Sequence, residues 1–237
     1  VWSLDPPIRR SMEFDGNSRL TVEAQKRHHL QSWTLMAWVK PAEDLTGDSL
    51  IIRRTVKATS LSYMGDDLIN YELGLREVSA GLFAPYIRFV GLAAPGSGID
   101  PDVPVATEVS VNDSASINET EGGFQATGLI AAGEWVHLAG AYDTETHTMS
   151  LYLNGELSVY RNDVFPPNGM DLGTEKTVMG NLTIGGGTKT AGLVEQGFKG
   201  WLDDVQVLGG ALPAAQVKVA AAGMPAPGSP FRCSPPS

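Results

Sequence analysis

The dipeptide Asn154-Gly155 separates two short segments that both read as extended chain. In residues 148–153, apolar and polar residues alternate, so that Met149, Leu151 and Leu153 fall on one side; residues 156–160 then resume an extended pattern. Asn-Gly readily adopts the positive φ angles of a two-residue type I′ turn. These residues therefore predict a β-hairpin.

The same period of two recurs along the chain. In residues 33–40 it places Trp33, Leu35, Ala37 and Val39 on one face, and Pro41 ends the strand. Further strands are expected at residues 11–14, 19–22, 48–55, 71–76, 86–89, 123–128, 135–143, 181–185 and 197–208. So many short strands without helical periodicity predict an all-β fold of two antiparallel sheets. One short helix is expected near the end, with Pro213 in its first turn and Gly223 after its last.

Two segments depart from this pattern. Residues 91–122 are rich in Gly, Pro, Ser, Asp and Asn, which predicts a long insertion between strands. Residues 224–237 contain five prolines and three serines and are expected to form a linker or tail. The folded domain is therefore predicted to span residues 1–223. Because 42% of the residues are hydrophobic, a sizeable core is available to it.

Net charge, hydropathy and cysteine content limit the kinds of partner that the chain can have. The 27 acidic residues outnumber the 17 basic ones and give a net charge of −10, so a nucleic-acid phosphate backbone would be repelled. No apolar run reaches the roughly 20 residues of a membrane span, so membrane insertion is not expected. The single Cys233 cannot form an internal disulfide and is either free or paired with a neighbouring domain or chain.

Features of secretion favour an extracellular or cell-surface protein. Three Asn-x-Ser/Thr motifs predict glycosylation at Asn112, Asn118 and Asn181. A chain that begins at Val1 is expected to have already lost any signal peptide.

Five segments, taken in order, resemble the laminin-G-like (concanavalin A-like) jelly roll, especially its pentraxin-related branch. They are Met12-Glu-Phe-Asp-Gly16 with Leu20-Thr-Val22, Trp33 to Pro41, Gly133 to Asp143 running into Met149 to Glu156, Leu182 to Gly186, and Phe198 to Val205. The resemblance covers residues 11 to 222, with residues 63–122 poorly matched and longer than usual. It implies a jelly-roll β-sandwich and a role in adhesion, sugar recognition or protein assembly.

Fold alone does not decide among these functions. The first hypothesis is a non-catalytic recognition module that binds a glycan or an extracellular protein within a larger secreted or surface protein. The second is a structural subunit of an extracellular filament or matrix that self-assembles, in part through its tail. The third is an accessory domain of a carbohydrate-active enzyme.

The resemblance implies calcium as a candidate cofactor. Alternation from Trp201 puts Asp203 on one face with Val205 and Val207, which predicts a partly buried carboxylate with a definite partner. Some relatives bind Ca²⁺ between the loop after the first strand and the penultimate strand. By that analogy the ligands are Asp15 and Asn17, together with Asp203 or Asp204. The alternative is that Asp203 accepts hydrogen bonds and binds no metal.

Residues for catalysis are not apparent. Related glucanases carry Glu-x-Asp-x-x-Glu on one strand, whereas Glu72 and Glu77 here fall on opposite faces with no aspartate between them. Metalloprotease, serine-hydrolase and phosphate-loop motifs are absent from the sequence as well. Trp33, Trp38 and Trp135 lie in strand patterns and are expected in the core. The sequence therefore predicts a protein that is not an enzyme.

Overall fold

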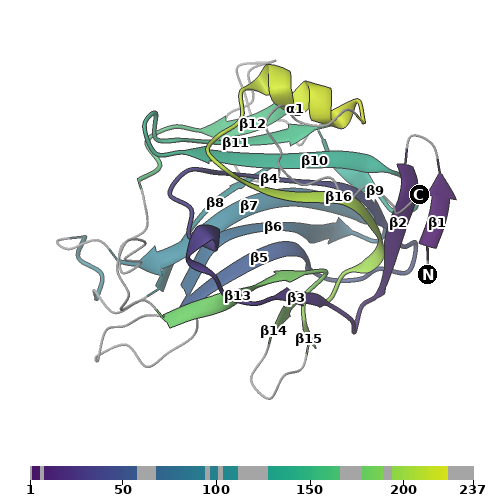
Figure 1. The fold of residues 1–237 in the computed structure, drawn as a ribbon, viewed down its shortest axis with the longest axis horizontal. Helices are drawn as coiled ribbons and strands as arrows, with labels where there is room; N and C mark the ends of the chain where they lie inside the picture. The colour runs from purple at the N-terminus through teal and green to yellow at the C-terminus, as the bar shows by residue number, and fades with distance from the viewer. Residues whose placement is uncertain are drawn as a thin grey trace.

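Two antiparallel β-sheets pack face to face in the computed structural model (Figure 1). The structure describes residues 2–5, 8–57, 68–93, 97–100, 104–111, 128–165, 178–188 and 194–223. Among these residues, no helix has both the length and the apolar composition needed to cross a bilayer. The predicted β-sandwich of jelly-roll type is confirmed.

Sheet A has the strand order β1-β2-β16-β4-β10-β11-β12. Its strands are β1 (Trp2–Asp5), β2 (Ile8–Asp15), β16 (Lys199–Gly209), β4 (Trp33–Pro41), β10 (Val136–Asp143), β11 (Thr148–Leu153) and β12 (Glu156–Arg161). The hairpin of β11 and β12 turns at Asn154 and Gly155, whose φ angles are +50° and +82°. Both angles are positive, as a type I′ turn requires, so the predicted hairpin is confirmed.

Sheet B has the order β3-β13-β5-β6-β7-β8, and β9 pairs with β7 beside this path. Its strands are β3 (Leu20–Val22), β13 (Val178–Ile184), β5 (Ser49–Lys57), β6 (Leu68–Ser79), β7 (Leu82–Leu92), β8 (Pro104–Ser110) and β9 (Ile130–Ala131). A 3-10 turn (Lys26–His28) precedes β4, and the small ribbon of β14 (Gly187–Thr188) and β15 (Val194–Glu195) follows β13.

The predicted strands agree with the structure except around the insertion. Residues 104–110 were expected to lie in a long loop but form β8, an edge strand of sheet B. The segment Pro104-Val-Ala-Thr-Glu-Val-Ser110 does alternate, but prolines and acidic residues around it hide the pattern. The strand predicted at 123–128 lies almost entirely outside the described residues.

The core fills the space between the two inner faces. Trp33 is buried beside Tyr71 and Tyr142, with ring centroids 6.1 and 6.0 Å away. Gly140 of β10 faces Ile87 of β7, where an added Cβ would lie 2.2 Å from Ile87 Cγ2. The sheets approach closely here because glycine presents no side chain to Ile87.

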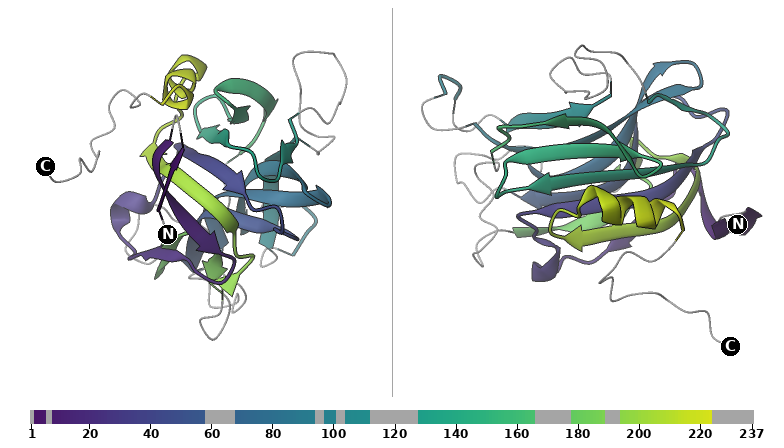
Figure 2. Two further views of the ribbon diagram at one scale, coloured as in Figure 1. Left: turned by 90° about the vertical axis from the view of Figure 1, so that its right-hand side faces the viewer. Right: turned by 90° about the horizontal axis from the view of Figure 1, so that it is seen from above.

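Helix α1 (Ala214–Ala221) lies against the outside of sheet A, as Figure 2 shows from above. It begins after Pro213 and ends before Gly223, close to the predicted bounds. Val217 and Ala220 are buried in a second apolar cluster with Met36, Ala139 and Tyr152. Helix α1 therefore covers part of the outer face of sheet A.

Candidate functional site on the outer face of sheet B

A row of polar side chains crosses sheet B at one level, from β3 through β13, β5, β6 and β7 to β8. Strand register places one residue of each strand beside the next, in the order Thr21, Thr183, Arg53, Glu72, Arg88, Glu108. Residues in register on neighbouring strands point to the same face. On β6, Tyr71 and Leu73 enter the core, so Glu72 between them belongs to the outer face. The last four members thus alternate in charge across β5 to β8.

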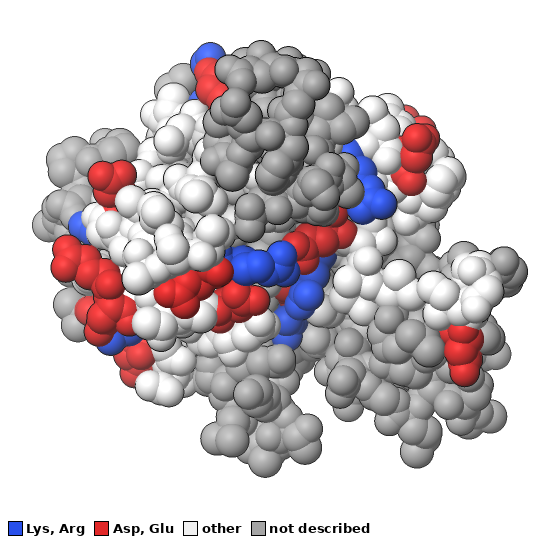
Figure 3. All heavy atoms as spheres, turned by 180° about the vertical axis from the view of Figure 1, so that it is seen from behind, with Lys and Arg blue, Asp and Glu red and all other residues white. Residues whose placement is uncertain are grey.

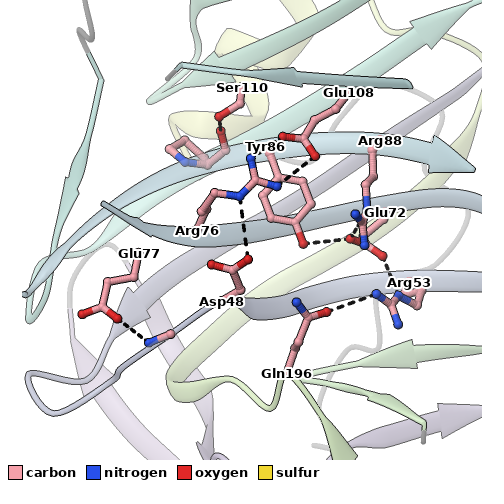
Figure 4. A network of polar contacts seen from close by, with 12 residues as sticks. Asp48, Arg53, Glu72, Arg76, Glu77, Tyr86, Arg88, Glu108, Ser110 and Gln196 are labelled. Carbon is pink, nitrogen blue, oxygen red and sulfur yellow. Dashed lines mark hydrogen bonds and ion pairs between the residues drawn. The ribbon is translucent and has the colours of Figure 1, made fainter. Parts of the chain in front are cut away.

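Glu72 lies at the centre of this row and is bound from three sides (Figure 4). Its Oε2 accepts a hydrogen bond from Arg53 Nε, while Oε1 accepts from Arg88 Nε and from the Tyr86 hydroxyl, each at 2.8 Å. The carboxylate has no exposed surface although it stands on the outer face. A buried charge of this kind is tolerated only because it is fully paired and hydrogen-bonded.

A second ion pair flanks the first. Arg76 donates from Nη1 and Nη2 to the two carboxylate oxygens of Glu108, at 2.6 and 3.1 Å, and its Nε lies 3.7 Å from Asp48. Both oxygens of Glu108 are therefore taken by Arg76 and not by its row neighbour Arg88. The pairing raises the pKa of Arg76 further, chiefly through the hydrogen bond to Glu108.

Tyr86 supports both guanidinium groups. Arg76 and Arg88 lie 5.1 and 5.5 Å from the centre of its ring. The ring crosses Gly74 on the neighbouring strand, where a Cβ would lie 2.5 Å from Tyr86 Cζ, so only glycine leaves room for it. Burial, together with the Glu72 carboxylate, raises the pKa of Tyr86 well above its usual value. The phenol therefore keeps its proton and donates a hydrogen bond to Glu72.

The loop before β16 provides one wall of the site. Gln196 Oε1 accepts a hydrogen bond from Arg53 Nη2 at 3.3 Å, and the Gln196 carbonyl accepts one from the Leu50 amide at 2.8 Å. Figure 3, which views this side of the molecule, shows acidic and basic side chains gathered in a band across the middle of the face.

The predicted calcium ligands do not come together. Asp15, at the end of β2, stands opposite Lys199, four residues before Asp203 on β16. Asp15 Oδ1 accepts hydrogen bonds from the amides of Asn17 and Ser18 at 2.9 and 2.8 Å, which closes a local turn and lowers its pKa. Strand residues rise about 3.3 Å each, so Asp15 and Asp203 are separated by about 13 Å along the sheet.

Asp203 also lies on the opposite face from the one predicted. The pairing partners are Trp38 for Asp203 and Met36 for Gln206, so β16 carries one extra residue, and Asp204 has a φ of +44°. This β-bulge reverses the alternation: Leu202, Val205 and Val207 all pack on the main core. Asp203 faces outward instead and is only partly buried, with Oδ1 accepting from the Asp204 amide at 2.8 Å.

A single calcium site built from Asp15, Asn17, Asp203 and Asp204 does not fit this geometry. In the described part of the chain, no group of three or more His, Cys, Asp or Glu side chains is arranged to hold a metal ion. Calcium bound elsewhere stays a prediction.

The other predicted residues have mixed outcomes. Asn181 is exposed on β13, with Oδ1 accepting from the Ala24 amide, while Asn112 and Asn118 lie outside the described residues, as does Cys233. Trp33 is buried as predicted, but Trp38 and Trp135 are only partly buried. Trp38 stacks edge-on against His137, outside the core, because it alternates with Trp33, Leu35, Ala37 and Val39.

Sequence reasoning did not single out Arg53, Arg88 and Glu108 as candidate site residues. The available signal was a set of polar side chains on one face of each strand, opposite apolar ones: Glu72 and Arg76, on either side of Gly74, on β6, and Tyr86 and Arg88 on β7. Their pairing could be recognised only once the strand order was known.

This architecture defines a lectin-like β-sandwich. Residues 14–218 match the family model Laminin_G_3, described as the concanavalin A-like lectin/glucanases superfamily, and the chain belongs to this family. No curated protein sequence matches it significantly.

Solved structures with a similar fold have low sequence identity. The CBM40 of a Ruminococcus gnavus IT-sialidase, bound to α2,3-sialyllactose, is 13% identical, with a TM-score of 0.56 over 89% of this chain and 96% of that one. Domain 4 of the extracellular GH43 arabinanase AbnA from Geobacillus stearothermophilus, in complex with arabinotriose, is 16% identical (TM-score 0.51; 93% and 80% covered). The heptameric SAP-like pentraxin of Limulus polyphemus is 17% identical (TM-score 0.51; 89% and 81% covered).

Proposed function

We propose that this domain is a non-catalytic carbohydrate-binding module that acts outside the cell, and that it binds glycans on the outer face of sheet B. The observation that carries the proposal is the charged row around Glu72. Membership of a lectin and glucanase superfamily supports it, as do the two similar structures that hold sialyllactose and arabinotriose.

Fold stability alone does not account for the charged row. Replacing a buried ion pair by well-packed apolar residues is commonly neutral or stabilising. An outer sheet face can also be covered with ordinary hydroxyl and amide side chains. Glu72 is better explained as a buried anchor that holds Arg88, the more exposed of its two arginines, rigidly in place for a ligand. Sugar hydroxyl groups both donate and accept hydrogen bonds, and fixed carboxylate and guanidinium groups match them in both roles.

The same geometry argues against glycoside hydrolysis at this face. A retaining glycosidase places two carboxyl groups about 5–5.5 Å apart on either side of the scissile bond, one of them protonated at the start. Glu72 has no exposed surface and accepts three hydrogen bonds, so it cannot reach a glycosidic oxygen. Both oxygens of Glu108 are bound to Arg76.

A specific form of this function is an accessory domain of a carbohydrate-active enzyme. Two of the similar structures are such parts: the CBM40 of a sialidase and domain 4 of an arabinanase. A catalytic domain encoded in the same gene would establish this form, and its absence from the full-length gene would exclude it.

Glycan arrays followed by calorimetry on the purified domain test the proposal. Glu108→Gln should weaken the affinity for the tightest-binding glycan about tenfold, because it removes a charge-assisted hydrogen bond that positions Arg76 on this face, and such a bond contributes roughly 1.5–3 kcal/mol. Glu156→Gln is the matched control, because Glu156 lies on β12 of sheet A, where its exposed side chain pairs with Lys218. Lack of binding to every glycan on a broad array would refute the proposal.

A further inference from the structure

Arg88 is the one arginine of the row whose outer edge is open. Its Nε donates to Glu72 at 2.8 Å, and its side chain is 22% exposed. Neither Nη1 nor Nη2 donates a hydrogen bond to any residue that the structure describes. The row neighbour that could have paired with these atoms, Glu108, is bound through both oxygens to Arg76.

Three contacts hold the Arg88 guanidinium in place before any ligand arrives. Glu72 fixes Nε, and Glu72 is itself held by Arg53 and Tyr86. The Tyr86 ring lies beneath the group at 5.5 Å. Burial lowers the pKa of Arg88, but Glu72 and Tyr86 outweigh that effect, so the charge is retained. A charged fork held rigidly in this way loses little entropy when it binds a partner.

From this geometry we infer that the open edge of Arg88 binds the carboxylate of an acidic sugar, such as a uronic or sialic acid residue. The inference rests on the proposed function and names the class of glycan. Two parallel N–H donors match the two oxygens of a carboxylate, whereas a sugar hydroxyl uses only one of them.

The acidic character of the whole protein does not prevent this contact. The net charge is −10, which repels anions at long range. At physiological ionic strength such fields are screened over about 8 Å. The guanidinium in direct contact with the ligand therefore decides the binding energy.

Two matched pairs of probes test the inference. They are 3′-sialyllactose against lactose, and a galacturonic acid trisaccharide against its methyl ester. We expect the wild-type domain to bind the acidic member of at least one pair about tenfold or more tightly than the neutral member. Arg88→Gln should reduce the affinity for that acidic probe to the level of its neutral counterpart.

Two further variants keep the result interpretable. Arg27→Gln removes the same charge from an exposed position in the 3-10 turn and should leave all affinities unchanged. Arg88→Lys keeps the charge near Glu72 but lacks the two parallel N–H donors of a guanidinium. It should therefore keep the fold while losing most of the preference for acidic over neutral probes. Thermal melts of each variant show whether the fold is intact.

The outcomes separate the two proposals. Neutral probes that bind as tightly as acidic ones, or an acidic preference that survives both Arg88 substitutions in folded protein, would overturn the inference but leave glycan binding standing. Absence of binding to any glycan would overturn the proposed function itself.

Discussion

Removing the charge of Glu72 should destabilise the domain strongly. Glu72→Gln keeps the size of the side chain but leaves the Arg53 and Arg88 guanidinium groups facing a neutral amide. Breaking one side of a buried ion pair costs about 3–5 kcal/mol, because the remaining charge stays desolvated. In a domain of this size, each kcal/mol lowers Tm by about 2–4 °C, so Tm should fall by about 6–20 °C.

Urea unfolding followed by tryptophan fluorescence, together with calorimetric melting, measures this loss. Glu156→Gln is the control: its exposed pair with Lys218 should contribute no more than about 1 kcal/mol. The double variant Glu72→Gln/Arg88→Gln should cost less than the sum of the two single variants, because it removes one of the unpaired guanidinium groups. A loss below about 1 kcal/mol for Glu72→Gln would refute the reasoning, since the row would then contribute no more than surface ion pairs.

Three further predictions follow from other parts of the fold. Gly140→Ala places a Cβ 2.2 Å from Ile87 Cγ2 and should lower the free energy of unfolding, measured in urea, by about 1–3 kcal/mol. Gly47→Ala serves as a comparison, because its strain comes only from the positive φ of residue 47. Equal losses of stability in the two variants would contradict a packing clash at Gly140. Burial lowers the pKa of His137 from 6.5 to about 4, so the neutral imidazole contributes its full share of the free energy of unfolding above pH 6.5. About 3 kcal/mol of that free energy is lost as the pH falls from 6.5 to about 4. His137→Gln should show a flatter loss of stability between pH 7 and pH 4, and parallel pH profiles would count against this assignment. Asp203→Asn should leave any difference in Tm between calcium and chelator unchanged, because Asp15 and Asp203 lie apart; if the difference disappears, the calcium site predicted from the sequence is restored.

Local chemistry was sufficient to predict most of the longer strands and the clearest turn, but not β8. The Asn154-Gly155 hairpin depends only on residues next to each other, and its φ angles are those that the turn type demands. In β4 the alternating face of Trp33, Leu35, Ala37 and Val39 was also read correctly, because no bulge interrupts its pairing with β10.

Alternation failed as a guide where a strand contains an irregularity. Counting by twos from Trp201 placed Asp203 with Val205 and Val207, but the extra residue at Asp203-Asp204 turns the valines back to the core. Nothing in Leu202-Asp-Asp-Val205 marks the bulge, since Asp204 adopts its positive φ without glycine. A one-residue insertion changes the face of every residue after it, so the calcium prediction was sensitive to a feature that only strand pairing reveals.

The charged row also depends on strand register, because its residues meet only when β6 and β7 pair as observed. The sequence places Glu72 and Gly74 on one face of β6, but it does not indicate that Arg88 lies beside the first and Tyr86 beside the second. A slip of β7 by one residue would bring Ile87 or Phe89 opposite Glu72, leave the carboxylate without its arginine and turn Arg88 toward the core. Each of those changes costs several kcal/mol, because it buries an unpaired charge. The row therefore penalises wrong pairings of β6 and β7, so the residues proposed to position a ligand also fix the register of the sheet that carries them.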